Sequence, residues 1–79
     1  MTFDKFFEEC DKAFGRLVGL SIKDMPDASW YEYYELEYKP IEALYDALED
    51  HWAMDMSEAQ YDYFHGVLAE HMSYEKIEG

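Results

Sequence analysis

Basic residues are scarce in this chain of 79 residues. Six Lys and Arg stand against nineteen Asp and Glu, which gives a net charge of −13 at neutral pH. So acidic a protein repels phosphate groups, which argues against direct binding to nucleic acid or to an anionic membrane surface. A basic protein is therefore the expected partner.

Cysteine and long apolar runs are also scarce. Cys10 is the only cysteine, so the chain cannot form an internal disulfide and has no paired cysteines for zinc. The most apolar stretch near the N-terminus, residues 13–20, is interrupted by Gly15, Arg16 and Gly19 and is too short for a membrane span or a secretory signal. We therefore expect a cytoplasmic protein without a membrane partner.

Signatures of catalysis and of cofactor binding are missing. With four glycines, the sequence has no Gly-rich phosphate loop, and it has no nucleophile elbow. His51, His65 and His71 are not spaced as a ligand set, and Asp62 with His65 forms only one imperfect copy of a helical di-iron motif. The sequence therefore predicts no enzyme activity, no cofactor and no bound metal.

Apolar residues recur at helical spacing along the chain, which predicts a single all-α domain over residues 1–79, a small bundle of about four amphipathic helices. The clearest helix begins after the candidate N-cap Thr2 and ends at Gly19, a typical C-cap residue. The predicted core consists of Phe6, Cys10, Phe14, Leu17, Leu44, Leu48, Phe64 and Leu68.

Turn and capping residues delimit the other helices. Residues 30–38 fit the pattern of a helix or of a strand, and a helix is favoured because the chain offers no second strand to pair with. Pro40 is suited to the first turn of a third helix over about 40–53. Ser57 begins a capping box that opens a fourth helix, and this helix is predicted to end near Ser73.

The negative charge is concentrated in one part of the chain. Residues 1–23 contain four acids and four bases, so residues 24–79 carry the whole excess. Carboxylates four residues apart on a helix repel one another by a few tenths of a kcal/mol per pair, so stability alone does not favour such a row. The predicted partner-binding residues are the acids Glu32, Glu35, Glu42, Asp46, Glu49 and Asp50, with Tyr31 and Leu36 as exposed apolar contacts.

The combination of a short helical domain, a net charge of −13 and eight tyrosines resembles the acidic DNA-mimic inhibitors of phages and mobile elements, which include some anti-CRISPR proteins. The resemblance is compositional and spans the chain. It implies an inhibitor that occupies the nucleic-acid groove of a defence or replication protein in a bacterial host cell.

Two alternatives remain open at this point. The chain fits a small helical adaptor or regulatory protein whose acidic face meets a basic patch on another protein. It also fits a structural phage or plasmid protein whose apolar faces form a homodimer. The sequence leaves both a monomer and a homodimer open.

Overall fold

Four α-helices and three short helical turns make up the computed structural model, which describes residues 2–78, with side chains described up to Met72. The α-helices are α1 (Phe3–Val18), α2 (Trp30–Glu35), α3 (Pro40–Ala47) and α4 (Glu58–Glu78). The short turns are η1 (Ile22–Asp24), η2 (Leu48–Trp52) and η3 (Ala53–Asp55). Because residues 2–78 contain no strand, the predicted all-α class is confirmed.

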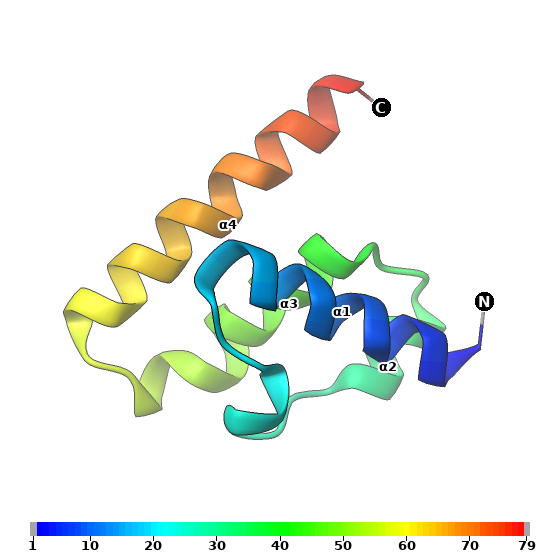
Figure 1. Cartoon of the computed structure of the whole chain (residues 1–79), viewed down its shortest axis with the longest axis horizontal. Coiled ribbons are helices and arrows are strands. Elements are labelled where there is room, and N and C mark those ends of the chain that lie inside the picture. Colours follow the sequence, from blue (N-terminus) through cyan, green and yellow to red (C-terminus); the bar gives the residue numbers. More distant parts are fainter. Residues whose placement is uncertain (1, 79) are drawn as a thin grey trace.

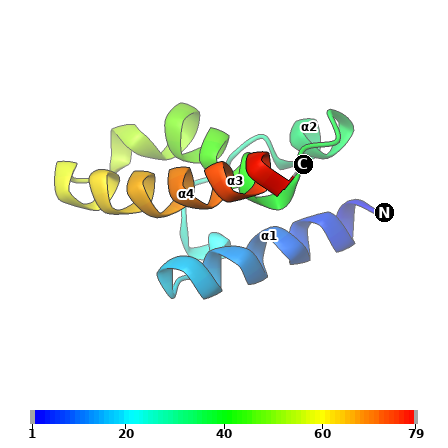
Figure 2. The same ribbon diagram turned by 90° about the horizontal axis from the view of Figure 1, so that it is seen from above.

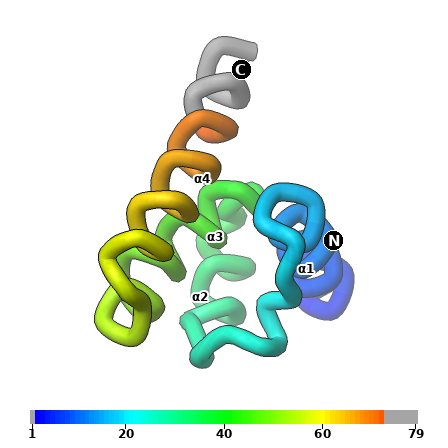
Figure 3. Tube along the Cα trace, turned by 60° about the vertical axis from the view of Figure 1, so that its left-hand side comes forward, coloured from blue at the N-terminus to red at the C-terminus, as the bar shows by residue number. Residues whose placement is uncertain are grey.

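The helix α3 lies at the centre of the arrangement and contacts both α1 and α4, while α2 packs against α1 (Figure 1). Seen from above, α1 runs along one side of the molecule, and α3 and α4 lie together on the other (Figure 2). Figure 3 follows the connection from α1 through η1 to α2. This arrangement brings residues distant in sequence to one core.

The predicted capping residues act as caps. The hydroxyl of Thr2 accepts a hydrogen bond from the backbone N–H of Lys5 at 3.2 Å, and Gly19 ends α1 with a φ of 77°, which glycine adopts without strain. At the start of α4, the Ser57 hydroxyl accepts from the N–H of Gln60 at 3.2 Å, and the Gln60 side chain accepts from the N–H of Ser57 at 3.4 Å. The predicted capping box is therefore confirmed.

Phe14 lies at the centre of the core. Its ring centroid is 5.3 Å from that of Trp52 and 5.7 Å from that of Phe64, so the side chain joins α1 to η2 and to α4. The predicted core residues are buried with one exception. Leu17 is only partly buried, because it lies in the last turn of α1, at the margin of the core.

The third helix departs from the predicted range of 40–53. Regular α-helix ends at Ala47, and Leu48–Trp52 forms a π-helical turn, which places an additional residue in one turn of the backbone. The side chain of Trp52 is fully buried there, and its indole N–H donates a hydrogen bond to the carbonyl of Pro26 at 2.7 Å. This long-range contact accounts for a local geometry that helical spacing does not predict.

The second helix is also shorter than predicted, because α2 ends at Glu35 and not at 38. The N–H of Tyr38 donates to the carbonyl of Tyr33 at 3.0 Å, and the N–H of Glu37 donates to that of Tyr34 at 3.1 Å. These two bonds form a Schellman motif, whose left-handed position usually holds glycine. Here Glu37 occupies it with a φ of 60°, a conformation that costs a non-glycine residue about 1–2 kcal/mol.

Two further differences concern the end of the fourth helix and the loop after α1. The fourth helix continues to Glu78 and not to the predicted end near Ser73, because residues 74–78 contain neither glycine nor proline to stop it. The loop after α1 contains the turn η1, where the Asp11 carboxylate accepts hydrogen bonds from the Ser21 hydroxyl at 2.8 Å and from the N–H of Ile22 at 2.9 Å. Buried Ile22 thereby fixes this connection to the core.

Candidate protein-binding surface

Three of the predicted acidic residues come together where α2, α3 and η2 approach one another. Glu32 lies in the first turn of α2, Asp46 lies on α3 and Asp50 lies in η2. We call these three residues the acidic patch. The second helix thus places one carboxylate, that of Glu32, close enough to act on Asp46.

The pKa of Asp46 records this proximity. Partial burial raises the pKa of this carboxyl, the negative charge of Asp50 and a hydrogen bond shared with Asp50 raise it further, and the charge of Glu32 acts in the same direction. His51 opposes the shift by favouring the ionised form. The raised pKa of Asp46 therefore has two sources, its partial burial and the negative charges of its two neighbours.

A tyrosine lies buried beside the acidic patch. Tyr33 is 2% exposed, and its hydroxyl has no hydrogen-bond partner among the side chains that the structure describes. Burial raises the pKa of this phenol, and the charges of Asp46, Asp50 and Glu32 raise it further. The patch thus adjoins a neutral hydroxyl that is held in place by packing and keeps its hydrogen-bonding capacity unused.

Basic side chains do not neutralise the patch within residues 2–72. The ion pairs that Lys forms there are Lys5–Glu9 at 3.1 Å and Lys12–Glu8 at 3.0 Å, and both lie along α1. The separation of balanced and unbalanced charge seen in the sequence is therefore a separation in space. The negative charge of the patch is therefore exposed to a molecule that approaches α2 and α3.

Glu49, another predicted partner-binding residue, contacts α4 instead of the acidic patch. Its carboxylate accepts a hydrogen bond from the Tyr61 hydroxyl at 2.7 Å and lies 3.4 Å from the imidazole of His65, both on α4. The bond to Glu49 raises the pKa of Tyr61 to about 12. His65 also shares a hydrogen bond of 2.9 Å with the Tyr45 hydroxyl. Glu49 therefore joins η2 to α4.

Glu42 has a local structural role that the sequence prediction missed. Its carboxylate accepts a hydrogen bond from the backbone N–H of Lys39 at 2.9 Å and so caps the start of α3, where Pro40 is the first residue as predicted. The predicted apolar contacts Tyr31 and Leu36 are exposed, at 59% and 57%. Tyr31 lies on α2, with its ring centroid 5.4 Å from that of Phe3 on α1, and Leu36 lies just after α2.

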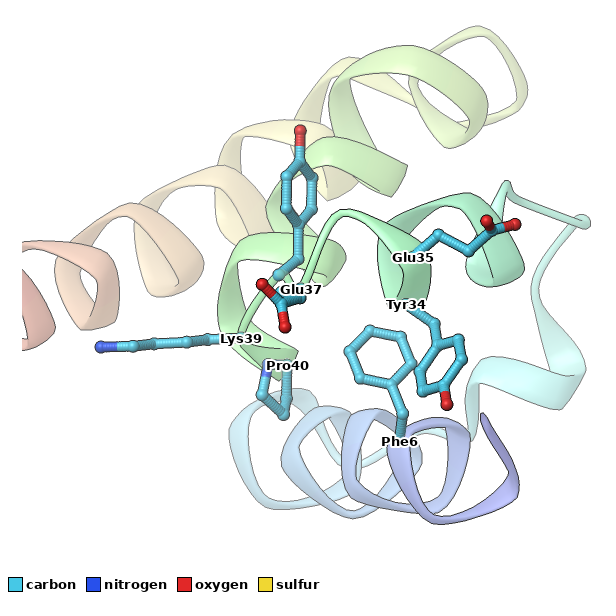
Figure 4. Close-up of a pocket in the computed structure, with 7 residues that line it drawn as sticks. Phe6, Tyr34, Glu35, Glu37, Lys39 and Pro40 are labelled. Atoms are coloured by element: carbon cyan, nitrogen blue, oxygen red, sulfur yellow. The ribbon is translucent and has the colours of Figure 1, made fainter. Parts of the chain in front are cut away.

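Glu35, the remaining predicted residue, lines a pocket of about 500 Å³ between the end of α2 and the start of α3. Phe6, Tyr34, Glu37 and Tyr38 also contribute to its wall (Figure 4). The sequence does not predict this pocket, because residues 34–40 contain neither glycine nor asparagine, the residues typical of a left-handed turn. Glu35 is therefore separated in role from the acidic patch.

Neutralising Asp46 is expected to stabilise the fold at pH 7. Because folding raises the pKa of Asp46, its ionised form destabilises the folded state, and this cost disappears as the pH falls and the group is protonated. Asp46→Asn is expected to raise the melting temperature by about 2 °C at pH 7. The difference is expected to vanish below the ordinary carboxyl pKa of about 3.9.

Thermal unfolding followed by circular dichroism at several pH values measures this effect. Glu70→Gln is the matched control. Glu70 is exposed on α4, so this substitution removes one negative charge at a site away from the patch. An Asp46→Asn variant that melts at or below the parent temperature at pH 7 contradicts the assigned repulsion.

Metal binding gains no support from the geometry of the described residues. Among them, no group of three or more His, Cys, Asp or Glu side chains is placed to hold a metal ion. In the same part of the chain, no helix has the length and apolar character needed to cross a membrane.

Comparison with known proteins finds no match: neither a protein-family model, nor a curated protein, nor a solved structure resembles this chain closely enough to be assigned to it. The functional conclusion therefore rests on the geometry and charge of the surface itself.

Proposed function

We propose that this protein is a binding protein, not an enzyme, that attaches to a basic nucleic-acid-binding protein and covers its nucleic-acid site with carboxylates. The acidic patch is the observation that carries the proposal. Glu32, Asp46 and Asp50 converge from three elements, and no described Lys or Arg pairs with them. Holding like charges together costs stability, and a cationic partner that removes this repulsion gives the arrangement a purpose.

The spacing of the carboxylates supports mimicry of a phosphate backbone. In a regular α-helix, acids four residues apart recur about every 6 Å along the axis, whereas phosphates recur about every 3.4 Å along one DNA strand. One helical row therefore has about half the linear charge density of a strand. The carboxyl groups of Asp46 and Asp50 lie closer together than in such a row, because they share a hydrogen bond. Glu32 adds charge from a neighbouring helix, which brings the surface closer to the density of DNA.

Exposed apolar side chains on and just after α2 support a protein partner. Tyr31 on α2 and Leu36 just after it present large apolar groups to solvent. Tyrosine is enriched at protein interfaces, since its ring supplies contact area and its hydroxyl a hydrogen bond. The combination favours a partner with basic groups at the centre of its site and apolar contacts at the edge.

The test has two steps, and the second distinguishes mimicry of nucleic acid from the alternatives. Affinity capture from a nuclease-treated bacterial lysate supplies the partner, and a fluorescent DNA or RNA duplex bound to that partner then reports displacement. We expect the protein to release the duplex at about one molecule per partner site, with a potency that falls as salt rises. A stable ternary complex of protein, partner and duplex contradicts mimicry and indicates the adaptor alternative. A doubled mass without any partner indicates the homodimeric structural protein.

A further inference from the structure

The pocket between α2 and α3 combines aromatic walls with carboxylates. Phe6 on α1 and Tyr34 on α2 lie with ring centroids 6.0 Å apart and form one wall, as Figure 4 shows. Tyr38 lines the pocket as well and is held by stacking on buried Tyr33, with ring centroids 5.5 Å apart and planes 9° apart. The pocket therefore offers aromatic surface that is fixed by core packing.

Glu37 lines this pocket in an unusual backbone conformation. The Schellman motif at the end of α2 places Glu37 in the left-handed region, with a φ of 60°, where glycine is the usual residue. Figure 4 shows its carboxylate next to Pro40, on the side of the pocket opposite the rings of Phe6 and Tyr34. A strained non-glycine residue at a pocket wall points to a function for its side chain.

The chemistry of the wall selects a cation with a flat face. An arginine guanidinium stacks on aromatic rings and at the same time donates two parallel hydrogen bonds to a carboxylate, which a lysine ammonium cannot do. Glu37 disfavours an anionic ligand at this pocket, whereas the carboxylate of Glu35 extends away from the rings in Figure 4. The one basic residue of the wall, Lys39, extends away from the rings in Figure 4. Its side chain therefore leaves the space beside the rings open.

We propose that this pocket binds one arginine side chain of the basic partner, with the guanidinium between the aromatic wall and Glu37. The volume of about 500 Å³ is in the range of small-molecule sites, so it accommodates an arginine side chain but not a folded segment. The assignment rests on the proposed function, because the basic partner supplies the arginine. It adds a specific anchor to a surface whose other carboxylates act through charge.

A titration with a blocked arginine tests the pocket without any nucleic-acid-binding protein. N-acetyl-arginine N-methylamide is added to the isotope-labelled protein, and the amide resonances are followed by NMR. We expect saturable shifts at residues 35–39. The matched probe is N-acetyl-citrulline N-methylamide, which has nearly the same shape without the charge and is expected to bind about tenfold more weakly.

Two variants locate the contact. Glu37→Gln is expected to weaken arginine binding by about fivefold, the upper range for an exposed ion pair, and its amide spectrum verifies that the fold is kept. Glu70→Gln removes one charge from α4, far along the chain from the pocket, and is expected to bind as the parent does. Equal binding of citrulline, equal effects of the two variants, or shifts confined to the acidic patch would overturn the assignment.

The outcome is distinguishable from failure of the proposed function. Displacement of a nucleic acid requires the acidic patch and a complete partner, whereas the titration requires only the pocket and a small probe. A protein that binds blocked arginine but forms a ternary complex with partner and duplex refutes mimicry and leaves the pocket assigned. A protein that displaces the duplex but shows no saturable shifts at residues 35–39 refutes the pocket alone.

Discussion

Neutralising the whole acidic patch is expected to slow association with the basic partner by about 10- to 100-fold at low salt. The triple variant Glu32→Gln, Asp46→Asn, Asp50→Asn removes three carboxylates that lie together and keeps the shape of each side chain. Single substitutions remove too little, because an exposed ion pair contributes about 0–1 kcal/mol. Stopped-flow mixing with the captured partner measures the association rate directly, and we expect the dissociation rate to change less.

A second triple variant separates the patch from net charge. Asp55→Asn, Asp62→Asn, Glu70→Gln also removes two Asp and one Glu charge, from exposed positions in η3 and α4. We expect it to associate at nearly the parental rate. The rate for the parent is also expected to fall steeply between 0.1 and 1 M salt, since the Debye length shrinks from about 10 Å to about 3 Å. Equal rates for the two triple variants would show that no particular carboxylates guide the encounter.

Truncating Phe14 is expected to have the largest effect on stability. Phe14→Ala removes a fully buried ring that contacts Trp52 and Phe64 and leaves a cavity where α1, η2 and α4 meet. The expected loss is about 3–5 kcal/mol, a large part of the stability of a small domain. The corresponding fall in melting temperature is about 12 °C or more.

Urea unfolding of the parent and the variant measures this loss, and the slope of each transition shows whether both unfold in two states. Met54→Ala is the control, because Met54 is 97% exposed and its truncation is expected to change stability by less than about 0.5 kcal/mol. A Phe14→Ala variant as stable as Met54→Ala would refute the central position of this ring.

Local patterns in the sequence were sufficient to predict the helices and most of the core. The stripe from Phe6 to Phe14 repeats at helical spacing, and each helix start or stop that was predicted correctly depends on a residue within four positions of it, such as Thr2, Gly19 or Pro40. Capping and periodicity are short-range effects, so they can be recognised without knowledge of the tertiary structure.

The errors arise where a long-range contact changes the local geometry. The π-helical turn at Leu48–Trp52 accompanies a bond from Trp52 to a carbonyl 26 positions earlier, and Glu49 turns toward α4 to meet Tyr61 and His65. A regular helical wheel places Glu49 beside Asp46 and Asp50, so the sequence alone grouped it with them. The sequence offered Glu32 as part of a second acidic row, and in the structure its charge acts on Asp46.

The pocket was missed for a different reason. Sequence rules for left-handed turns look for glycine or asparagine, and this turn uses Glu37. Such rules do not detect a left-handed turn that is formed by a different residue type.

Because Cys10 is buried, the reactivity of its thiol reports transient opening of the core. Cys10 is the only thiol in the sequence, it is 0% exposed, and burial raises its pKa to about 12. A thiol reagent reacts with an accessible thiolate, so modification proceeds only through molecules whose core has opened. The labelling rate, divided by that of a free thiol, therefore gives the population of open molecules. Comparing this population with and without the partner shows how far binding suppresses opening of the core, and no residue has to be introduced as a probe.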